Sequence, residues 1–197
     1  MAGLLFLTAL EGNIKTINHA LLCMRDWDES DGDLDVFKLV TDKAAIRNDN
    51  DGTSLPLKSL PENVWTSANL EDIETYCMNV KRGDDEHKGA NLFVTIDSAG
   101  IENKTCILAS LPDGYYENPD TFRGRYDKIR VPWDDLYMIW CNLDLANMNF
   151  EEFTEEEDGD DQSWFTYQSI YEVDDDHKAG LMRRDKKIGR WAQQGYV

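Results

Sequence analysis

The stretch "NLFVTIDSAGIENKTCILASL", from Asn91 to Leu111, contains the two strongest strand candidates of the chain. Its first part, "NLFVTIDS", and its last part, "KTCILASL", are apolar and rich in β-branched residues, a composition that favours β-strands. Short apolar runs without polar alternation are typical of strands that are covered on both faces. We therefore predict that these two segments lie at the centre of a sheet with helices on both sides.

The flanking segments alternate between strand and helix patterns. Upstream, the patterns predict strand, helix, strand and helix in turn, at Leu4–Leu10, Asn13–Arg25, Val36–Thr41 and 67–80. Downstream, "KIRVP" predicts a short strand, and Pro132 opens a helix because proline suits the first helical position. The order fits one layered α/β domain with a small mixed sheet and about three helices, which ends near Phe153.

The composition changes after Phe153. Eight of the eleven residues from Glu151 to Asp161 are acidic, and the aromatic segment "SWFTYQSIYEV" follows. The segment from Lys178 to Val197 has a net charge of +5, so the rest of the chain carries −24. We predict an α/β domain over 1–153 and an extension over 154–197 made of an acidic linker, an aromatic segment and a basic tail. The pattern allows this extension to pack on the domain, on a neighbouring subunit, or on neither.

The totals restrict the classes of partner. The chain has 197 residues, of which 41% are hydrophobic, and a formal net charge of −19. That charge excludes simple binding to phosphate backbones, which requires an excess of Lys and Arg, and it favours basic partners. The sequence has no run of about 18 apolar residues, the length that a membrane-spanning helix requires, so no membrane span is predicted. We therefore expect a basic protein partner, no nucleic acid and no membrane, with a homodimer as one possible assembly.

The opening residues "MAGLLFLTALEG" are apolar but lack the basic start of a secretory signal, so they indicate a strand. The cysteines show no CxxC pair and lie in apolar segments, at Cys23, Cys77, Cys106 and Cys141. This pattern predicts buried free thiols in a cytoplasmic protein.

No metal or cofactor motif is present. An EF-hand calcium loop has Asp at its first position and Gly at its sixth. Placing Gly32, Gly52 or Gly159 at the sixth position puts Trp, Arg or Thr at the first, so none of the three acidic loops fits. The histidines show no zinc-ligand spacing and are His19, His87 and His177. We therefore predict no metal and no cofactor.

The segment from "LFVTIDS" to "CNLDLANMNFEEF" resembles an uncharacterised α/β domain family of bacteria and fungi with a C-terminal "NNLxxANMxFxEF"-like signature. Cys141 stands where the family tends to have another Asn. The resemblance covers roughly Asn91 to Phe153 and implies an α/β fold and a cytoplasmic setting, but no activity. The residues that carry the signature are Trp140, Asn142, Leu143, Ala146, Asn147, Met148, Phe150, Glu152 and Phe153.

The signature favours a structural role over a catalytic one. Asn142 and Asn147 can cap the end of a helix or bond the backbone of a turn, as asparagine commonly does. Phe150 and Phe153 would hold the following turn against the core. Trp140 belongs to the buried face of the preceding helix.

Two functions from different classes remain. The favoured one is a non-enzymatic acidic binding protein, for example an inhibitor or immunity protein for a basic partner. Its expected partner-binding residues are Glu155, Glu156, Glu157, Asp158, Asp160, Asp161 and Trp164. The alternative is a small metabolic enzyme or ligand-binding accessory protein with a pocket at the carboxyl ends of the central strands. There, Asp97 is a weak candidate for a catalytic acid. We favour the interpretation that Asp97 is a turn residue at the end of a strand.

Overall fold

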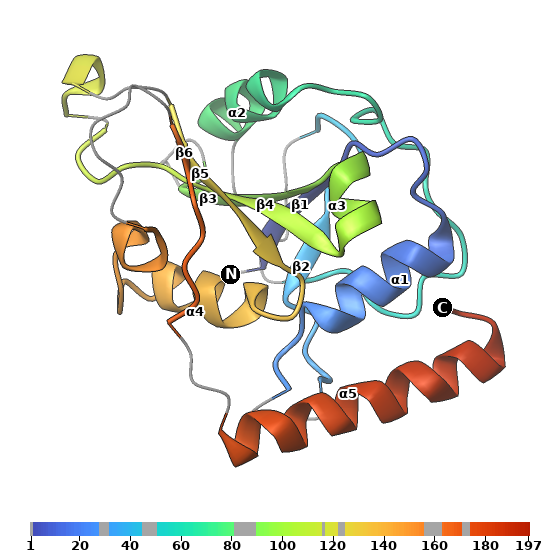
Figure 1. The fold of residues 1–197 in the computed structure, drawn as a ribbon. Helices are drawn as coiled ribbons and strands as arrows, with labels where there is room; N and C mark the ends of the chain where they lie inside the picture. Colours follow the sequence, from blue (N-terminus) through green and yellow to red (C-terminus); the bar gives the residue numbers. More distant parts are fainter. Residues whose placement is uncertain are drawn as a thin grey trace.

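A single mixed sheet organises the part of the chain that the structure describes, in the strand order β2-β1-β3-β4-β5-β6 (Figure 1). The structure is a computed structural model. It describes residues 2–27, 32–44, 51–80, 90–115, 117–121, 125–155, 163–170 and 174–197. The strands are β1 Gly3–Leu7, β2 Phe37–Leu39, β3 Leu92–Ile96, β4 Thr105–Ser110, β5 Asp127–Pro132 and β6 Trp164–Phe165.

Parallel and antiparallel pairing divide the sheet into two halves. Strand β1 pairs in parallel with both β2 and β3, whereas β4 pairs antiparallel with both β3 and β5. Strand β6 then adds to β5 in parallel, with Lys128 opposite Trp164 and Ile129 opposite Phe165. The predicted central strands are β3 and β4, and they occupy the third and fourth of the six positions.

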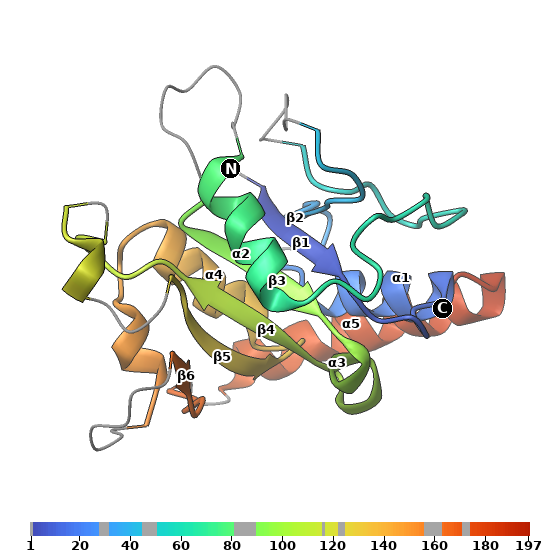
Figure 2. The same cartoon turned by 90° about the horizontal axis from the view of Figure 1, so that it is seen from above.

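Helices cover both faces of this sheet (Figures 1 and 2). They are α1 Ile14–Cys23, α2 Leu70–Asn79, α3 Ser98–Asn103, α4 Leu136–Asp144 and α5 Asp175–Gln194, with short 3-10 turns η1 Pro119–Thr121 and η2 Phe150–Phe153. Successive side chains of a strand point to opposite faces. Accordingly, Leu5 and Leu7 join one core cluster with α1 and α4, while Leu4 and Phe6 join a second cluster with α2.

The α/β class and the mixed sheet confirm the sequence prediction, but the helix count differs. The described residues contain five α-helices rather than about three, and the two unexpected ones are α3 and α5. Helix α3 fills the short connection between the two central strands, where Asp97 accepts a hydrogen bond from the Gly100 amide and caps it. Helix α5 is formed by the predicted basic tail.

The described parts of the C-terminal extension contact the α/β domain. Strand β6 pairs with β5, and an isolated antiparallel bridge joins Thr154 to Tyr167. Helix α5 lies against α1, on the side of α1 away from the sheet (Figure 1). Of the three arrangements that the sequence allowed, packing on the domain is therefore the one observed. That residues 1–153 fold without the extension stays a prediction.

The four cysteines all lie in the described residues and are free thiols, as the sequence predicted. Cys23, Cys77 and Cys106 are buried, and Cys141 is partly exposed. No helix within the described ranges combines the length and the apolar character that crossing a bilayer would require.

Candidate functional site

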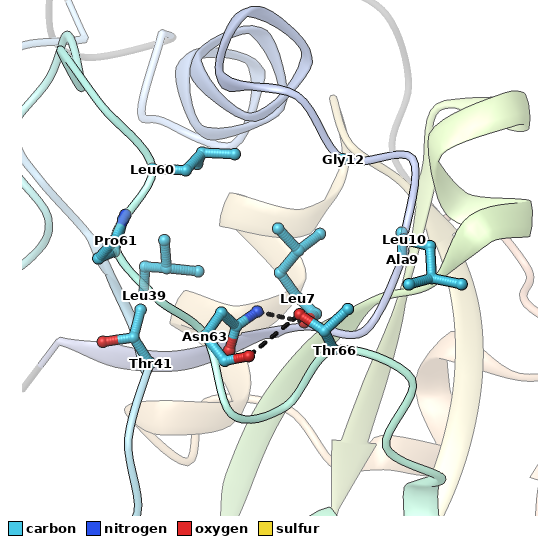
Figure 3. Close-up of a pocket in the computed structure, with 10 residues that line it drawn as sticks. All are labelled: Leu7, Ala9, Leu10, Gly12, Leu39, Thr41, Leu60, Pro61, Asn63 and Thr66. Carbon is cyan, nitrogen blue, oxygen red and sulfur yellow. Dashed lines mark hydrogen bonds between the residues drawn. The ribbon is translucent and has the colours of Figure 1, made fainter.

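A small pocket lies at the carboxyl ends of the parallel strands β1 and β2 (Figure 3). Its volume is about 150 Å³, and the segments after β1 and β2 and the loop 60–66 line it. The lining residues are mostly apolar and are Leu7, Ala9, Leu10, Gly12, Leu39, Thr41, Leu60, Pro61, Asn63 and Thr66. This is the edge of an α/β sheet at which ligands commonly bind.

Two polar side chains that line the pocket, those of Asn63 and Thr66, are hydrogen-bonded by the segments that build it. The Asn63 side chain donates to the Leu7 carbonyl at 2.7 Å and accepts from the Trp65 amide at 3.0 Å. The Thr66 hydroxyl donates to the Asn63 carbonyl at 3.1 Å (Figure 3). These bonds tie the loop 63–66 to the end of β1. The presence of Asn63 and Thr66 in the pocket is therefore explained by their role in holding this loop, without a ligand.

The predicted pocket position near Asp97 and Ser98 is one strand away from the pocket observed. Ser98 lies across the carboxyl ends of β1 and β3, where its hydroxyl donates to the Glu11 carboxylate at 2.7 Å. This hydrogen bond lowers the pKa of the fully exposed Glu11. Neither Asp97 nor Ser98 is among the residues that line the pocket.

Asp97 is held by two structural partners. In addition to capping α3, its carboxylate accepts two hydrogen bonds from the Arg130 guanidinium, at 3.0 and 2.6 Å. Burial alone would raise the pKa of Asp97, but the bonds from Arg130 and the Gly100 amide outweigh it and hold the pKa below its ordinary value. A carboxylate that stays ionised in this way suits an anchor between β5 and α3 better than a proton donor.

The signature segment forms the end of α4. The Asn147 amide donates to the Asn142 carbonyl at 2.9 Å, and the Ala146 amide donates to the Leu143 carbonyl at 3.1 Å. Together these two bonds make a Schellman motif, with Ala146 in the left-handed region at φ +52°. The backbones of Asn142 and Asn147 thus close the helix, whereas the Asn142 side-chain amide donates to the Met138 carbonyl.

The aromatic residues of the signature are core residues. Phe153 is fully buried, and Trp140 and Phe150 are nearly so. The Trp140 ring meets Phe37 of β2 edge to face at 5.5 Å, and the Phe150 ring meets Phe165 of β6 at 5.7 Å. These contacts join α4 and η2 to both edges of the sheet, which agrees with the structural interpretation of the signature.

The acidic stretch connects two segments that pair with each other. The Glu155 amide donates to the Thr166 carbonyl at 3.0 Å, and the Gln168 amide donates to the Phe153 carbonyl at 2.9 Å. The two described ends of the stretch therefore lie at one edge of the sheet, and we call the sequence 155–163 the acidic loop. Of the predicted partner-binding acids, Glu155 is exposed, and Glu156, Glu157, Asp158, Asp160 and Asp161 lie outside the described residues.

Trp164 stands at the return of the acidic loop, on the outer strand β6, and 38% of its surface is exposed. Its neighbour Phe165 turns to the opposite face and packs on Phe150. Behind it, the Tyr167 hydroxyl donates to the Asp135 carboxylate at 3.0 Å. Burial raises the pKa of Asp135, and the bond from Tyr167 counteracts part of that shift.

A cysteine and a histidine lie one turn apart on α1, which sequence reasoning did not pair. His19 is half-buried against Trp133, with ring centroids 6.1 Å apart. Burial, followed by the nearby Asp134, raises the pKa of Cys23 to about 12. Because the thiolate is the nucleophilic form, this pKa argues against Cys23 as a catalytic nucleophile.

Within the described ranges, His, Cys, Asp and Glu side chains form no cluster of three that could hold a metal ion. His87 lies outside those ranges, while His177 lies in the first turn of α5. Comparison of the chain with protein-family models, curated proteins and solved structures finds no match.

Proposed function

We propose that this chain is a non-enzymatic acidic binding protein of the cytoplasm, for example an inhibitor or immunity protein for a basic protein partner. We include in this proposal the resemblance of Asn91–Phe153 to the α/β family with the "NNLxxANMxFxEF"-like signature. The observation that carries it is the base of the acidic loop. There, Trp164 keeps 38% of its surface exposed on an edge strand, and the exposed carboxylates of Glu151, Glu152 and Glu155 belong to the segment that leads into the loop.

This combination suits the two stages of protein association. Carboxylates around a docking site raise the association rate of a cationic partner, because they attract it before contact. A tryptophan supplies the large apolar contact that slows dissociation, and tryptophan is enriched among residues that dominate binding energy. The backbone pairing of Glu155 with Thr166 fixes the two sides of the loop base relative to each other.

The alternative proposal is a small metabolic enzyme or ligand-binding accessory protein that uses the pocket at the carboxyl ends of β1 and β2. The position of the pocket favours it. Its volume of about 150 Å³ and the internally bonded Asn63 and Thr66 argue against it, since pockets for drug-sized ligands occupy roughly 300–1,000 Å³. Asp97 remains the weak catalytic candidate of this alternative.

The test is a kinetic comparison with the partner captured from the native host and then purified. We expect Glu151→Gln, Glu152→Gln and Glu155→Gln, introduced together, to lower the association rate constant about tenfold at low salt. The matched control neutralises three exposed carboxylates elsewhere, Glu62→Gln, Glu102→Gln and Asp113→Asn. Trp164→Ala should instead raise the dissociation rate constant.

Equal association rates for the two triple variants would remove the loop base from the docking site. A captured partner that is itself acidic, or whose association rate does not depend on salt, would overturn the proposed function.

A further inference from the structure

Helix α5 is attached to the domain by apolar contacts and by three basic side chains. Gly180 is its buried residue, and Ile188 is the side chain of α5 that packs partly buried against a core cluster. The basic residues Arg183, Arg184 and Lys187 point to the domain. Arg183 and Arg184 each lie about one turn from Lys187, at i+4 and i+3 spacing, so both border Lys187 on the side of the helix that contacts the domain.

The first half of the contact is made with the segment after α1. The Arg183 guanidinium donates to the Trp27 carbonyl at 2.5 Å. The Lys187 ammonium binds the Asp33 carboxylate at 2.9 Å and the Gly32 carbonyl at 3.4 Å, and it lies 5.5 Å from the centre of the Trp27 ring. Carbonyls, a carboxylate and an aromatic face are all groups that attract cations.

The second half is made with the start of α4. The Arg184 guanidinium lies 2.6 Å from the Asp134 carboxylate and 3.0 Å from Asp185 of its own helix. Only 12% of the Arg184 side chain is exposed, so this contact is more shielded from solvent than that of Lys187 with Asp33. Burial disfavours the charged form of Arg184, but Asp134 outweighs this effect and raises its pKa.

The surface beneath α5 is held in shape without α5. The buried Arg25 binds the Gly32 carbonyl and the Asp35 carboxylate, and the Trp27 indole donates to the Leu22 carbonyl at 2.9 Å. Gly32 has φ +63°, and a Cβ at this position would lie 2.5 Å from the Trp27 ring. The acceptor groups for a cationic helix are therefore positioned by the domain's own contacts.

The end of α5 is recognised as well. Asn18, which is fully buried on α1, donates to the Tyr196 carbonyl at 2.9 Å. The same Asn18 side chain donates to the Leu57 carbonyl and accepts from the Leu57 amide, so its orientation is fixed. A side-chain amide held in this way offers a donor to the carbonyl end of a helix.

We propose that this α5-binding surface, formed by Asn18, Trp27, Gly32, Asp33 and Asp134, is a binding site for a cationic helix of a partner protein. Helix α5 is its intramolecular occupant, and a partner helix with basic residues at positions i, i+1 and i+4 competes with it. The carboxylates of both ion pairs, Asp134 and Asp33, are open to solvent, so salt screens these contacts and allows a competing cationic helix to displace α5. The inference rests on the proposed function in that the partner is basic. It adds a second contact surface for that partner, beneath α5 and separate from the acidic loop.

The experiment uses the full chain and a labelled synthetic peptide that copies Asp174–Val197. The inward variant is Arg183→Gln, Arg184→Gln and Lys187→Gln together. The control variant, Lys178→Gln, Lys186→Gln and Arg190→Gln, removes the same charge from exposed positions of the same helix. We expect the inward variant to bind the peptide at least about tenfold more tightly than the wild-type chain, and the control variant to bind it as the wild-type chain does.

Two further measurements make the result specific. A peptide with the three inward substitutions should bind the inward variant at least about tenfold more weakly than the unchanged peptide. Hydrogen exchange of α5 amides in the wild-type chain should accelerate as salt rises, and should already be fast in the inward variant. The single variant Lys187→Gln, which removes the charged contacts with Asp33 and the Trp27 ring, should give intermediate peptide binding if the triple variant folds poorly.

Equal peptide binding by the inward and control variants would overturn the proposal, as would salt-independent protection of α5. Neither result involves the natural partner of the acidic loop, so this inference and the proposed function fail independently.

Discussion

Helices α2 and α5 are both tied to the domain by a lysine–carboxylate pair, but the surroundings of the two pairs differ. Lys128 and Glu74 join β5 to α2 at 2.8 Å, and their side chains are 6% and 11% exposed. Lys187 and Asp33 join α5 to the segment after α1 at 2.9 Å, with exposures of 17% and 78%. Nearly equal distances thus correspond to a dry contact in one case and a wet contact in the other.

The difference shows how the same chemical pair serves two purposes. Loss of one member of a buried pair leaves a desolvated charge behind, which is strongly destabilising. The pair on α5 is hydrated from one side and contributes little. In addition, α2 buries Ile73 and Cys77, whereas α5 buries Gly180. We therefore predict that α2 unfolds together with the core and that α5 opens separately from it.

The largest effect is expected for Glu74→Ala. This change leaves the Lys128 ammonium buried without its carboxylate partner, although it still donates to the Tyr126 carbonyl at 2.6 Å. We expect a loss of about 3–5 kcal/mol in the free energy of unfolding. Urea denaturation measures it. The control is Glu71→Ala in the exposed first turn of the same helix, which should cost less than about 1 kcal/mol. Equal losses for both variants would contradict the comparison.

The half-exposed pair of Arg130 and Asp97 should fall between the two extremes. Asp97→Asn keeps a side chain that can cap α3 but removes the charge, and we expect a loss of about 1 kcal/mol at pH 7. The pKa of Asp97 is lowered from 3.8 in the folded state. Its contribution is therefore present above that value and disappears as the pH falls below it. Thermal melts from pH 7 to pH 3 should show the two proteins converging in stability, and a constant difference would contradict the assignment.

Two helix ends extend the comparison to the backbone. Helix α5 closes with the same pair of bonds as α4, from Gly195 to Ala192 and from Tyr196 to Trp191, but it places glycine at the left-handed position. Because a Cβ is disfavoured there, Ala146→Gly in α4 should stabilise the protein by about 0.5–1 kcal/mol. The matched change Gly195→Ala should loosen the end of α5. A drop in melting temperature for Ala146→Gly would refute this explanation.

The smallest effect is expected for Lys187→Gln. Its pair with Asp33 is screened by water and salt, so the free energy of global unfolding should change by less than about 0.5 kcal/mol. Hydrogen exchange within α5 should nevertheless become measurably faster, because local opening does not require the core to unfold. A global loss comparable to that of Glu74→Ala would show that α5 belongs to the core.

The sequence predicts the sheet and the helices that carry apolar faces. The runs at β3 and β4 and the apolar spacing of α1, α2 and α4 report burial directly. Helix α5 is not predicted because most of its residues are polar or charged, although its partly buried residues Leu181, Ile188 and Trp191 recur at helical spacing and could have indicated it. Helix α3 is too short to show a period.

The candidate sites are less predictable, because they depend on residues that are distant in the chain. Nothing in the sequence pairs Asp97 with Arg130 or Glu74 with Lys128, which the fold brings together from separate elements. The sequence also assigns the signature bonds to asparagine side chains, whereas the backbone makes the bonds that close α4. The residue types indicate where a helix ends, but the backbone dihedral angles φ and ψ decide whether backbone or side-chain atoms make the closing hydrogen bonds.

The closed base of the acidic loop has a consequence for the length of the chain within it. Thr154 and Tyr167 form an antiparallel bridge at that base, which fixes the two ends of the loop relative to each other. This pairing does not depend on the number of residues between them. The entropic cost of closing a flexible loop rises slowly, by about 0.6 kcal/mol for each doubling of its length. Because both ends are held at this base, we expect a small reporter domain inserted between them to leave the pairing of β5 with β6 unchanged.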